Sequence, residues 1–135
     1  MSTQKLPAIV LGGTGYVAGE LLRLIAAHPF VELKAILSDS QPGEPIAKYF
    51  AHLAPAYPEL KFSSLAEIAQ LVGTLPKSVI LSAAPHGVAA KLIDDLLKAA
   101  EAKGTQTTVI DISADYRYST PSAYEAVYKH AHGAP

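Results

Sequence analysis

The chain begins with two different spacings of hydrophobic residues, one after the other. Residues 8–11 form an unbroken apolar run, which is typical of a strand covered on both faces. After a glycine-rich stretch, apolar residues recur at helical spacing, at Val17, Leu21, Leu24 and Ile25. This change of period predicts a buried strand, a tight turn and an amphipathic helix. The helix is expected to end near Ala27, because Pro29 disfavours helix at His28.

The rest of the chain repeats the alternation of strand and helix. Further strands are predicted over residues 31–38, 78–82 and 107–111, and further helices over 65–72, 87–102 and 122–128. Ser64 and Glu67 have the spacing of a capping box, and Gly104 ends the helix before it. The pattern also allows a short helix over residues 46–50 and a short edge strand over 60–63.

Strands that alternate with helices indicate an α/β fold of the Rossmann type, with a parallel sheet and helices on both faces. Sheets of this kind bind ligands at the carboxyl ends of their strands. Four segments are expected at that edge: residues 12–19, 38–40, 83–87 and 112–115.

Composition narrows the classes of protein that remain. The 135 residues have the length of one domain, and the net charge of -1 argues against a nucleic-acid surface. No apolar run approaches the roughly 20 residues that span a membrane, so a cytoplasmic protein is the default expectation. The absence of cysteine excludes disulfides and thiolate ligands. His130 and His132 lack acidic or thiol partners nearby in the sequence, and we expect no metal site there.

The glycine turn is the first candidate site. Gly12, Gly15 and Ala18 follow the dinucleotide-binding fingerprint with a shift of one residue. Glycines let the backbone come close to another group, and the helix N-terminus behind them offers N–H donors to a pyrophosphate. A tight turn without a ligand is the alternative. The predicted cofactor-binding residues of the turn are Gly12, Gly13, Thr14, Gly15, Tyr16 and Val17.

Two other strand ends complete the predicted cofactor site. Ser38 and Ser40 are expected beside the adenosine ribose, where an acidic residue favours NAD and a basic one NADP. The serines with Asp39 between them leave that choice open, and a polar loop is the alternative. Pro85 and His86 are expected beside the nicotinamide, or else form a simple Pro-Gly turn with an incidental histidine.

Ser113 and Arg117 follow the last predicted strand. Arg117 is a candidate clamp for a carboxylate or phosphate, because its planar guanidinium binds two oxygens at once. A surface salt bridge is the alternative interpretation of this arginine.

Several short stretches together resemble one enzyme family, the N-acetyl-gamma-glutamyl-phosphate reductases, which are related to aspartate-semialdehyde dehydrogenase. The matching stretches are residues 12–24, 28–29, 85–87, 111–117, 124–125 and 128. The resemblance implies a two-domain, homo-oligomeric parent enzyme. Its first domain would be a Rossmann domain for NADP, and its second would carry dimerisation and much of the substrate site.

The resemblance also implies a mechanism. A cysteine thiolate attacks an acyl phosphate, phosphate leaves, and hydride from NADPH reduces the thioester, with a histidine as acid or base. Because this chain has no cysteine, residues 1–135 are expected to be the NAD(P)-binding domain of a longer enzyme, with the nucleophile beyond Pro135. The chain alone is then expected to be inactive and to hold no catalytic residue. Ser113 and Arg117 are assigned by resemblance to the substrate.

Alternatives in function also remain open. Asp39 stands where the family often has a basic residue, so NAD stays possible beside NADP. The parent enzyme is alternatively another acyl-phosphate or semialdehyde dehydrogenase, acting on an aspartyl or aminoadipyl substrate. A different class is a nucleotide-binding module that senses redox state without catalysis.

Overall fold

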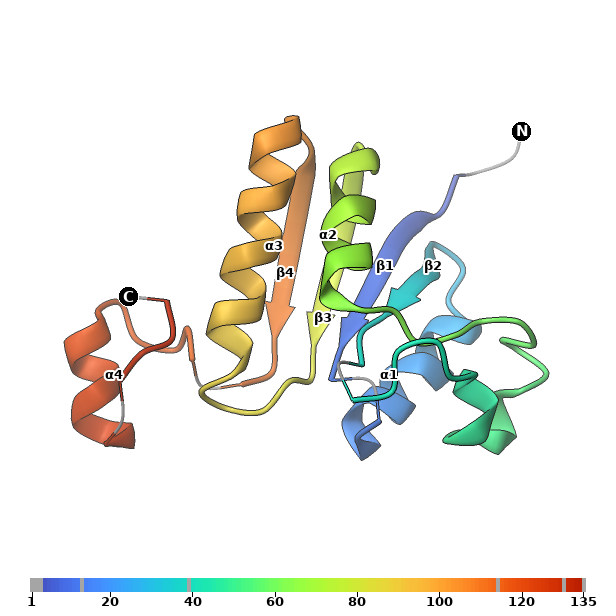
Figure 1. The fold of residues 1–135 in the computed structure, drawn as a ribbon, viewed down its shortest axis with the longest axis horizontal. Coiled ribbons are helices and arrows are strands. Elements are labelled where there is room, and N and C mark those ends of the chain that lie inside the picture. Colours follow the sequence, from blue (N-terminus) through green and yellow to red (C-terminus); the bar gives the residue numbers. More distant parts are fainter. Residues whose placement is uncertain (1–3, 13, 39, 114, 130, 135) are drawn as a thin grey trace.

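The fold is built around a parallel sheet. The computed structural model describes residues 4–12, 14–38, 40–113, 115–129 and 131–134. Four parallel strands pair in the order β2-β1-β3-β4 (Figure 1). They are β1 (Leu6–Leu11), β2 (Val31–Ile36), β3 (Lys77–Ser82) and β4 (Gln106–Asp111). The predicted Rossmann-type α/β fold is therefore confirmed.

Four helices accompany the sheet: α1 (Tyr16–Ala26), α2 (Leu65–Thr74), α3 (Ala89–Lys103) and α4 (Pro121–Tyr128). Two short 3-10 turns, η1 (Ile46–Lys48) and η2 (Ala51–Leu53), lie between β2 and α2. Figure 1 shows α4 apart from the sheet, on the far side of α3 from α1. Among the described residues, no helix combines the length and apolar character needed to cross a bilayer.

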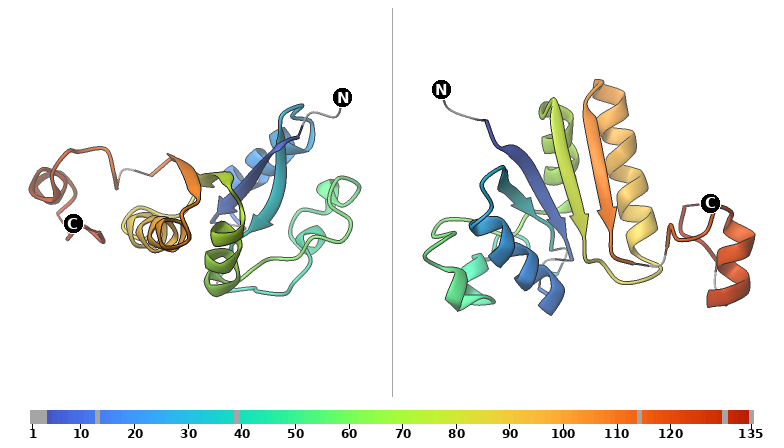
Figure 2. Two further views of the ribbon diagram at one scale, coloured as in Figure 1. Left: turned by 90° about the horizontal axis from the view of Figure 1, so that it is seen from above. Right: turned by 180° about the vertical axis from the view of Figure 1, so that it is seen from behind.

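Helices cover both faces of the sheet, and β1 shows why. Ala8 and Val10 belong to a buried cluster with Leu22 of α1, on one face. Ile9 and Leu11 belong to a second cluster with residues of α2 and α3, on the other face. Figure 2 shows α1 on one side of the sheet and α2 and α3 on the other. Alternate side chains of a strand point to opposite faces, so an unbroken apolar run needs cover on both sides.

At the β2 edge, the described part of the sheet lacks the additional edge strand that the sequence predicted. In place of an edge strand over residues 60–63, there are two isolated bridges, one parallel between Leu37 and Ser63 and one antiparallel between Pro45 and Lys61. The chain leaves the edge at once, because the next residue, Ser64, is already the N-cap of α2. The short helix expected over residues 46–50 is the 3-10 turn η1.

Two helices carry the local start signals that the sequence contains. Ser64 and Glu67 form the expected capping box at the start of α2. The Thr120 hydroxyl accepts a hydrogen bond from the Ala123 N–H at the start of α4. The helix expected from residue 87 instead begins at Ala89, because Gly87 has a φ of +85°, outside the helical region.

Candidate nucleotide-binding site

The carboxyl edge of the sheet has a switch point between β1 and β3. From β1 the chain moves to β2 on one side, and later to β3 and β4 on the other. Ligands of open α/β sheets bind in the crevice at such a point. The loop after β1 leads into α1, and the loop after β3 leads into α3, so these two loops face each other across the crevice.

Gly12 brings the two loops into direct contact. Its φ is +85°, and a Cβ atom at this position would lie 2.6 Å from the carbonyl oxygen of Ala83 and 2.9 Å from the nitrogen of Ala84. Both facts demand glycine for reasons internal to the protein. The sequence identified Gly12 correctly as a residue of close approach, but its near neighbour here is the backbone after β3.

Gly15 has the opposite surroundings. Its φ is −79° and its ψ is 165°, which any residue adopts. A Cβ atom here would meet Gly12 O at 3.8 Å, which is ordinary contact. Gly15 is also the N-cap of α1, and no side chain among the described residues caps this helix. The N-terminus of α1 therefore faces open space with its positive dipole end.

A cleft of about 420 Å³ runs past this helix end. Ser38 and Ser40 line it at the β2 side, and Pro85 lines it at the β3 side, with Thr14 and Gly15 between them. The structure thus brings together the three separate segments that the sequence proposed as one site. Gly13 and Asp39 lie outside the described residues.

The serines at the β2 side are partly engaged with each other. The Ser38 hydroxyl is nearly buried, accepts a hydrogen bond from the Gln41 N–H at 3.2 Å, and lies 3.4 Å from the Ser40 hydroxyl. These bonds hold the loop after β2 in place. Ser40 is exposed at the cleft and its hydroxyl keeps further hydrogen-bonding capacity.

A second, smaller cleft of about 220 Å³ lies on the other side of the loop after β3. Its lining includes Val17, Pro85, His86 and Ser113, and it shares residues 83–85 with the first cleft. His86 is exposed at its rim. The two clefts therefore have one wall in common, and that wall is the turn between β3 and α3.

The two predicted substrate residues have different places. Ser113 is buried, donates its hydroxyl hydrogen to the Asp111 carboxylate at 2.9 Å, and accepts from the Asp115 N–H at 3.1 Å. Arg117 is exposed and is not among the residues that line the two clefts. Of the pair, Ser113 alone belongs to the described walls of the site.

Asp115 is a buried acid at this edge whose role sequence reasoning missed. The residue is 1% exposed. One carboxylate oxygen accepts from the Gly87 N–H at 2.8 Å, and the other accepts from the Gly87 N–H at 3.0 Å and the Ala90 N–H at 2.9 Å. The Tyr124 hydroxyl donates to it at 2.9 Å. Asp115 thus closes the N-terminus of α3 from 25 residues away.

The electrostatics of this cluster agree with an ionised carboxylate. Burial by itself raises the pKa of Asp115, but the hydrogen bonds from Gly87, Ala90 and Tyr124 outweigh burial, so the pKa lies below its ordinary value. Burial and the bond to Asp115 raise the pKa of Tyr124 to about 12. The tyrosine therefore stays a neutral donor to a charged acceptor at neutral pH.

The C-terminal segment packs over the same cluster. The His132 ring donates from Nε2 to the Asp115 carbonyl, accepts at Nδ1 from the Ala134 N–H at 3.0 Å, and lies against the rings of Tyr116 and Tyr124. His130 is outside the described residues. Within the part of the chain that is described, no group of three or more histidine or acidic side chains is placed to hold a metal ion.

Residues 7–131 match the family model described as the semialdehyde dehydrogenase NAD-binding domain. The chain is 41% identical over 128 residues to N-acetyl-gamma-glutamyl-phosphate reductase of Nitrosococcus oceani, covering 95% of this chain and 34% of that protein. It is 36% identical over 135 residues to [LysW]-L-2-aminoadipate 6-phosphate reductase of Deinococcus radiodurans, covering 100% and 35%.

The chain spans about a third of the length of these curated relatives. Its fold is also similar to the crystal structure of RSP, a Rex-family repressor, with a TM-score of 0.55 at 10% identity, covering 93% of this chain and 59% of that one. The likeness to the repressor concerns the fold alone. The family match covers nearly the whole sheet together with its crevice, and the chain therefore belongs to the NAD-binding domains of the semialdehyde dehydrogenase family.

Proposed function

We propose that this chain is the cofactor-binding part of a reductase that converts N-acetyl-glutamyl 5-phosphate into N-acetyl-glutamate 5-semialdehyde and phosphate. The observation that carries the cofactor site is the unfilled space at Gly15. Its backbone makes no demand for glycine, and a Cβ there would meet no closer atom than Gly12 O at 3.8 Å. A pyrophosphate on the uncapped N-terminus of α1 would occupy the space that a side chain at this position would fill.

The two clefts suggest how a dinucleotide would lie. Its adenosine would sit at the Ser38 and Ser40 side, and its pyrophosphate at Gly15. The nicotinamide would then reach the wall formed by Pro85 and His86. This direction follows the general rule for open α/β sheets, in which the loop after the second strand meets the adenosine ribose.

We propose NADPH as the preferred reductant. Two serine hydroxyls at the β2 side provide donors for a 2′-phosphate, and the family resemblance implies NADP. In the reaction, a bound dihydronicotinamide supplies hydride, while the residues of this chain bind and orient it. The acyl phosphate would approach from the Ser113 side of the smaller cleft, with Arg117 as an outer contact.

Two proposals concern the parent enzyme as a whole. The names of the relatives support N-acetyl-glutamyl phosphate as its substrate. Arginine biosynthesis is what the family resemblance implies, and a cytoplasmic location is part of the same proposal. An aminoadipyl phosphate is the second candidate, because an aminoadipate 6-phosphate reductase matches the full length of this chain. The thiolate nucleophile implied by the resemblance would come from residues after Pro135.

Titration of the chain with NADPH and NADH tests the cofactor site. We expect the wild-type chain to bind NADPH more tightly than NADH, and Gly15→Val to weaken binding at least about ten-fold, because a branched side chain fills the pyrophosphate space. Ala102→Val is the matched control, since it adds the same kind of bulk to an exposed position of α3. Both variants should keep the wild-type circular dichroism spectrum.

The outcomes separate the parts of the proposal. If the wild-type chain binds neither cofactor, the reductase assignment is wrong. If Gly15→Val binds as tightly as wild type, the glycine turn does not hold the pyrophosphate. Reduction of the two candidate acyl phosphates by the product of the gene read past Pro135 distinguishes the two substrates.

A further inference from the structure

We propose that Asp115 is a positioning residue that fixes the His86–Gly87 peptide, and with it the wall on which the nicotinamide end of the cofactor would rest. This inference depends on the proposed function and deepens it. Asp115 itself lines neither cleft. It would act through the backbone of the turn between β3 and α3.

The first step is the direct bond to the turn. The N–H of Gly87 belongs to the same peptide unit as the carbonyl of His86, and it donates to both Asp115 carboxylate oxygens, at 2.8 and 3.0 Å. Gly87 has a φ of +85°, which glycine adopts at no steric cost and which keeps this residue outside the helix. A buried carboxylate supplies a charge-assisted acceptor at that place.

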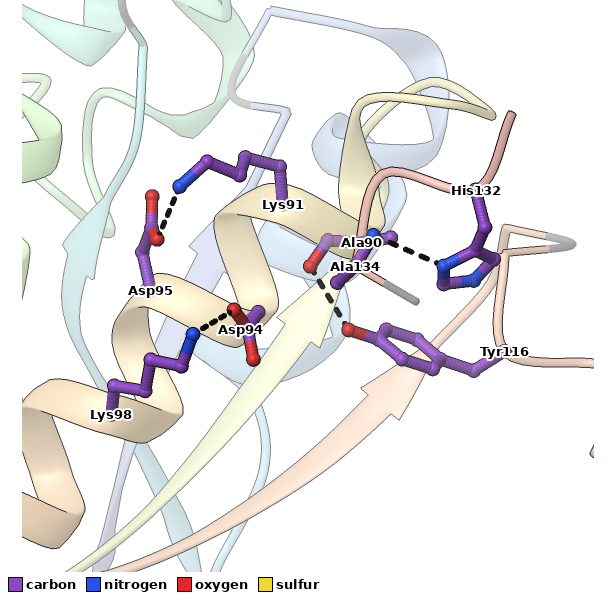
Figure 3. A network of polar contacts seen from close by, with 8 residues as sticks. All are labelled: Ala90, Lys91, Asp94, Asp95, Lys98, Tyr116, His132 and Ala134. Atoms are coloured by element: carbon purple, nitrogen blue, oxygen red, sulfur yellow. Dashed lines mark hydrogen bonds and ion pairs between the residues drawn. The ribbon is translucent and has the colours of Figure 1, made fainter. Parts of the chain in front are cut away.

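The second step is a clamp on the start of α3. Asp115 accepts from the Ala90 N–H at 2.9 Å. The neighbouring Tyr116 donates its hydroxyl hydrogen to the Ala90 carbonyl at 2.9 Å, as Figure 3 shows. Two consecutive residues therefore hold both backbone groups of Ala90. The turn before it is fixed at one end by β3 and at the other by this clamp.

The third step is the link from the clamp to the cleft. Ser113 lines the smaller cleft, and its hydroxyl accepts from the Asp115 N–H at 3.1 Å. The carboxylate of Asp115 reaches one wall of that cleft, through Gly87, and its backbone reaches another, through Ser113. Asp115 thus sets the spacing between His86 and Ser113, which are the two sides of the predicted nicotinamide end.

The test compares two ligands that differ only at the nicotinamide. Each protein is titrated with NADPH and with the matching phosphorylated ADP-ribose, which lacks the nicotinamide ring. In Asp115→Asn an amide group replaces one acceptor oxygen and faces an N–H donor. We expect about ten-fold weaker NADPH binding, a loss of the emission change of bound NADPH, and unchanged affinity for the ADP-ribose.

Asp95→Asn is the matched control. Asp95 lies on α3, the helix whose start Asp115 holds. Its carboxylate pairs with the Lys91 ammonium at 2.6 Å on the surface of the helix (Figure 3). It should bind both ligands as wild type does. Tyr124→Phe removes one donor to Asp115 and keeps the ring, and we expect the same selective weakening of NADPH binding, by about three-fold.

The outcomes are decisive in each case. A folded Asp115→Asn that binds NADPH as tightly as wild type, or loses both ligands in parallel, overturns the positioning role. If Asp115→Asn does not fold, Tyr124→Phe decides by the same criterion. If the wild-type chain binds neither ligand, the proposed function itself has failed, and the positioning role falls with it.

Discussion

The N-termini of α1 and α3 lie at the same edge of the sheet, but in the part of the chain that the structure describes a side chain binds the backbone N–H groups of only one of them, α3. α1 begins after Gly15, with no side-chain cap among the described residues and with Tyr16 97% exposed. α3 also has no local cap, yet Asp115 reaches its first turn and accepts from Gly87 and Ala90. Both ends present backbone N–H donors that have no partner within their own helix, and both carry the positive end of the helix dipole.

The comparison shows which of the two ends is available to an anion. At α3 the protein uses its own carboxylate, so a phosphate there would meet a like charge. At α1 the donors remain open and the adjacent glycine leaves space. A Rossmann-type sheet offers several helix ends along its carboxyl edge, and side-chain capping is one way to restrict the ligand to one of them.

The largest effect on stability is expected when Asp115, which caps the N-terminus of α3, is removed. Asp115→Ala leaves two backbone N–H groups and the Tyr124 hydroxyl without their acceptor in a buried place. We expect the free energy of unfolding to fall by about 3 kcal/mol. Urea denaturation followed by circular dichroism measures this free energy. A loss below about 1 kcal/mol would contradict the idea that the hydrogen bonds of Asp115 stabilise the start of α3.

The next largest effect on stability is expected at Gly12, which differs in this respect from Gly15. Gly12→Ala places a methyl group 2.6 Å from Ala83 O at a φ of +85°. We expect a loss of roughly 2 to 3 kcal/mol of stability, because strain and steric clash act together. The same denaturation experiment measures it, and wild-type stability would show that the loops after β1 and β3 can move apart freely.

The acid dependence of stability gives a smaller effect. The pKa of Asp115 is lowered in the folded chain, so its contribution is present above the pKa of the unfolded chain, near 4, and is lost as pH falls through the lower folded value. Wild type should therefore lose more stability than Asp115→Asn between pH 5 and pH 2, a window of about three units around that value. Parallel urea midpoints of the two proteins across this range would mean that folding does not lower the pKa of Asp115.

The smallest effect on stability is expected at the open end. Gly15→Ala has room for its methyl group at a φ of −79°, and it restricts the unfolded chain. We expect a change of no more than roughly 0.5 kcal/mol, because the restriction of the unfolded chain is offset by the poorer N-cap propensity of alanine. A clear loss on thermal denaturation would show that the protein itself requires glycine at this position, and the argument for a ligand would then fail.

Much of the fold follows from local patterns in the sequence. The apolar run at β1 predicts cover on both faces, and the capping box at Ser64 fixes the start of α2. The segments after β1, β2 and β3 were also placed correctly at one edge, because parallel strands end together. The start of α3 was predicted two residues early, since the φ of Gly87 depends on contacts beyond its own neighbourhood.

The class of the sheet, the glycine turn and the family resemblance can be recognised in the sequence, because they depend on periodicity and on residues close together in the chain. The different surroundings of the two glycines emerge from the folded chain, in which Gly12 contacts the backbone after β3 and Gly15 borders open space. The tertiary structure also decided the role of Asp115, whose partners lie 25 and 28 residues away in the chain. Such long-range contacts leave no local pattern, and they distinguish the helix end that is open to a ligand from the one that is closed.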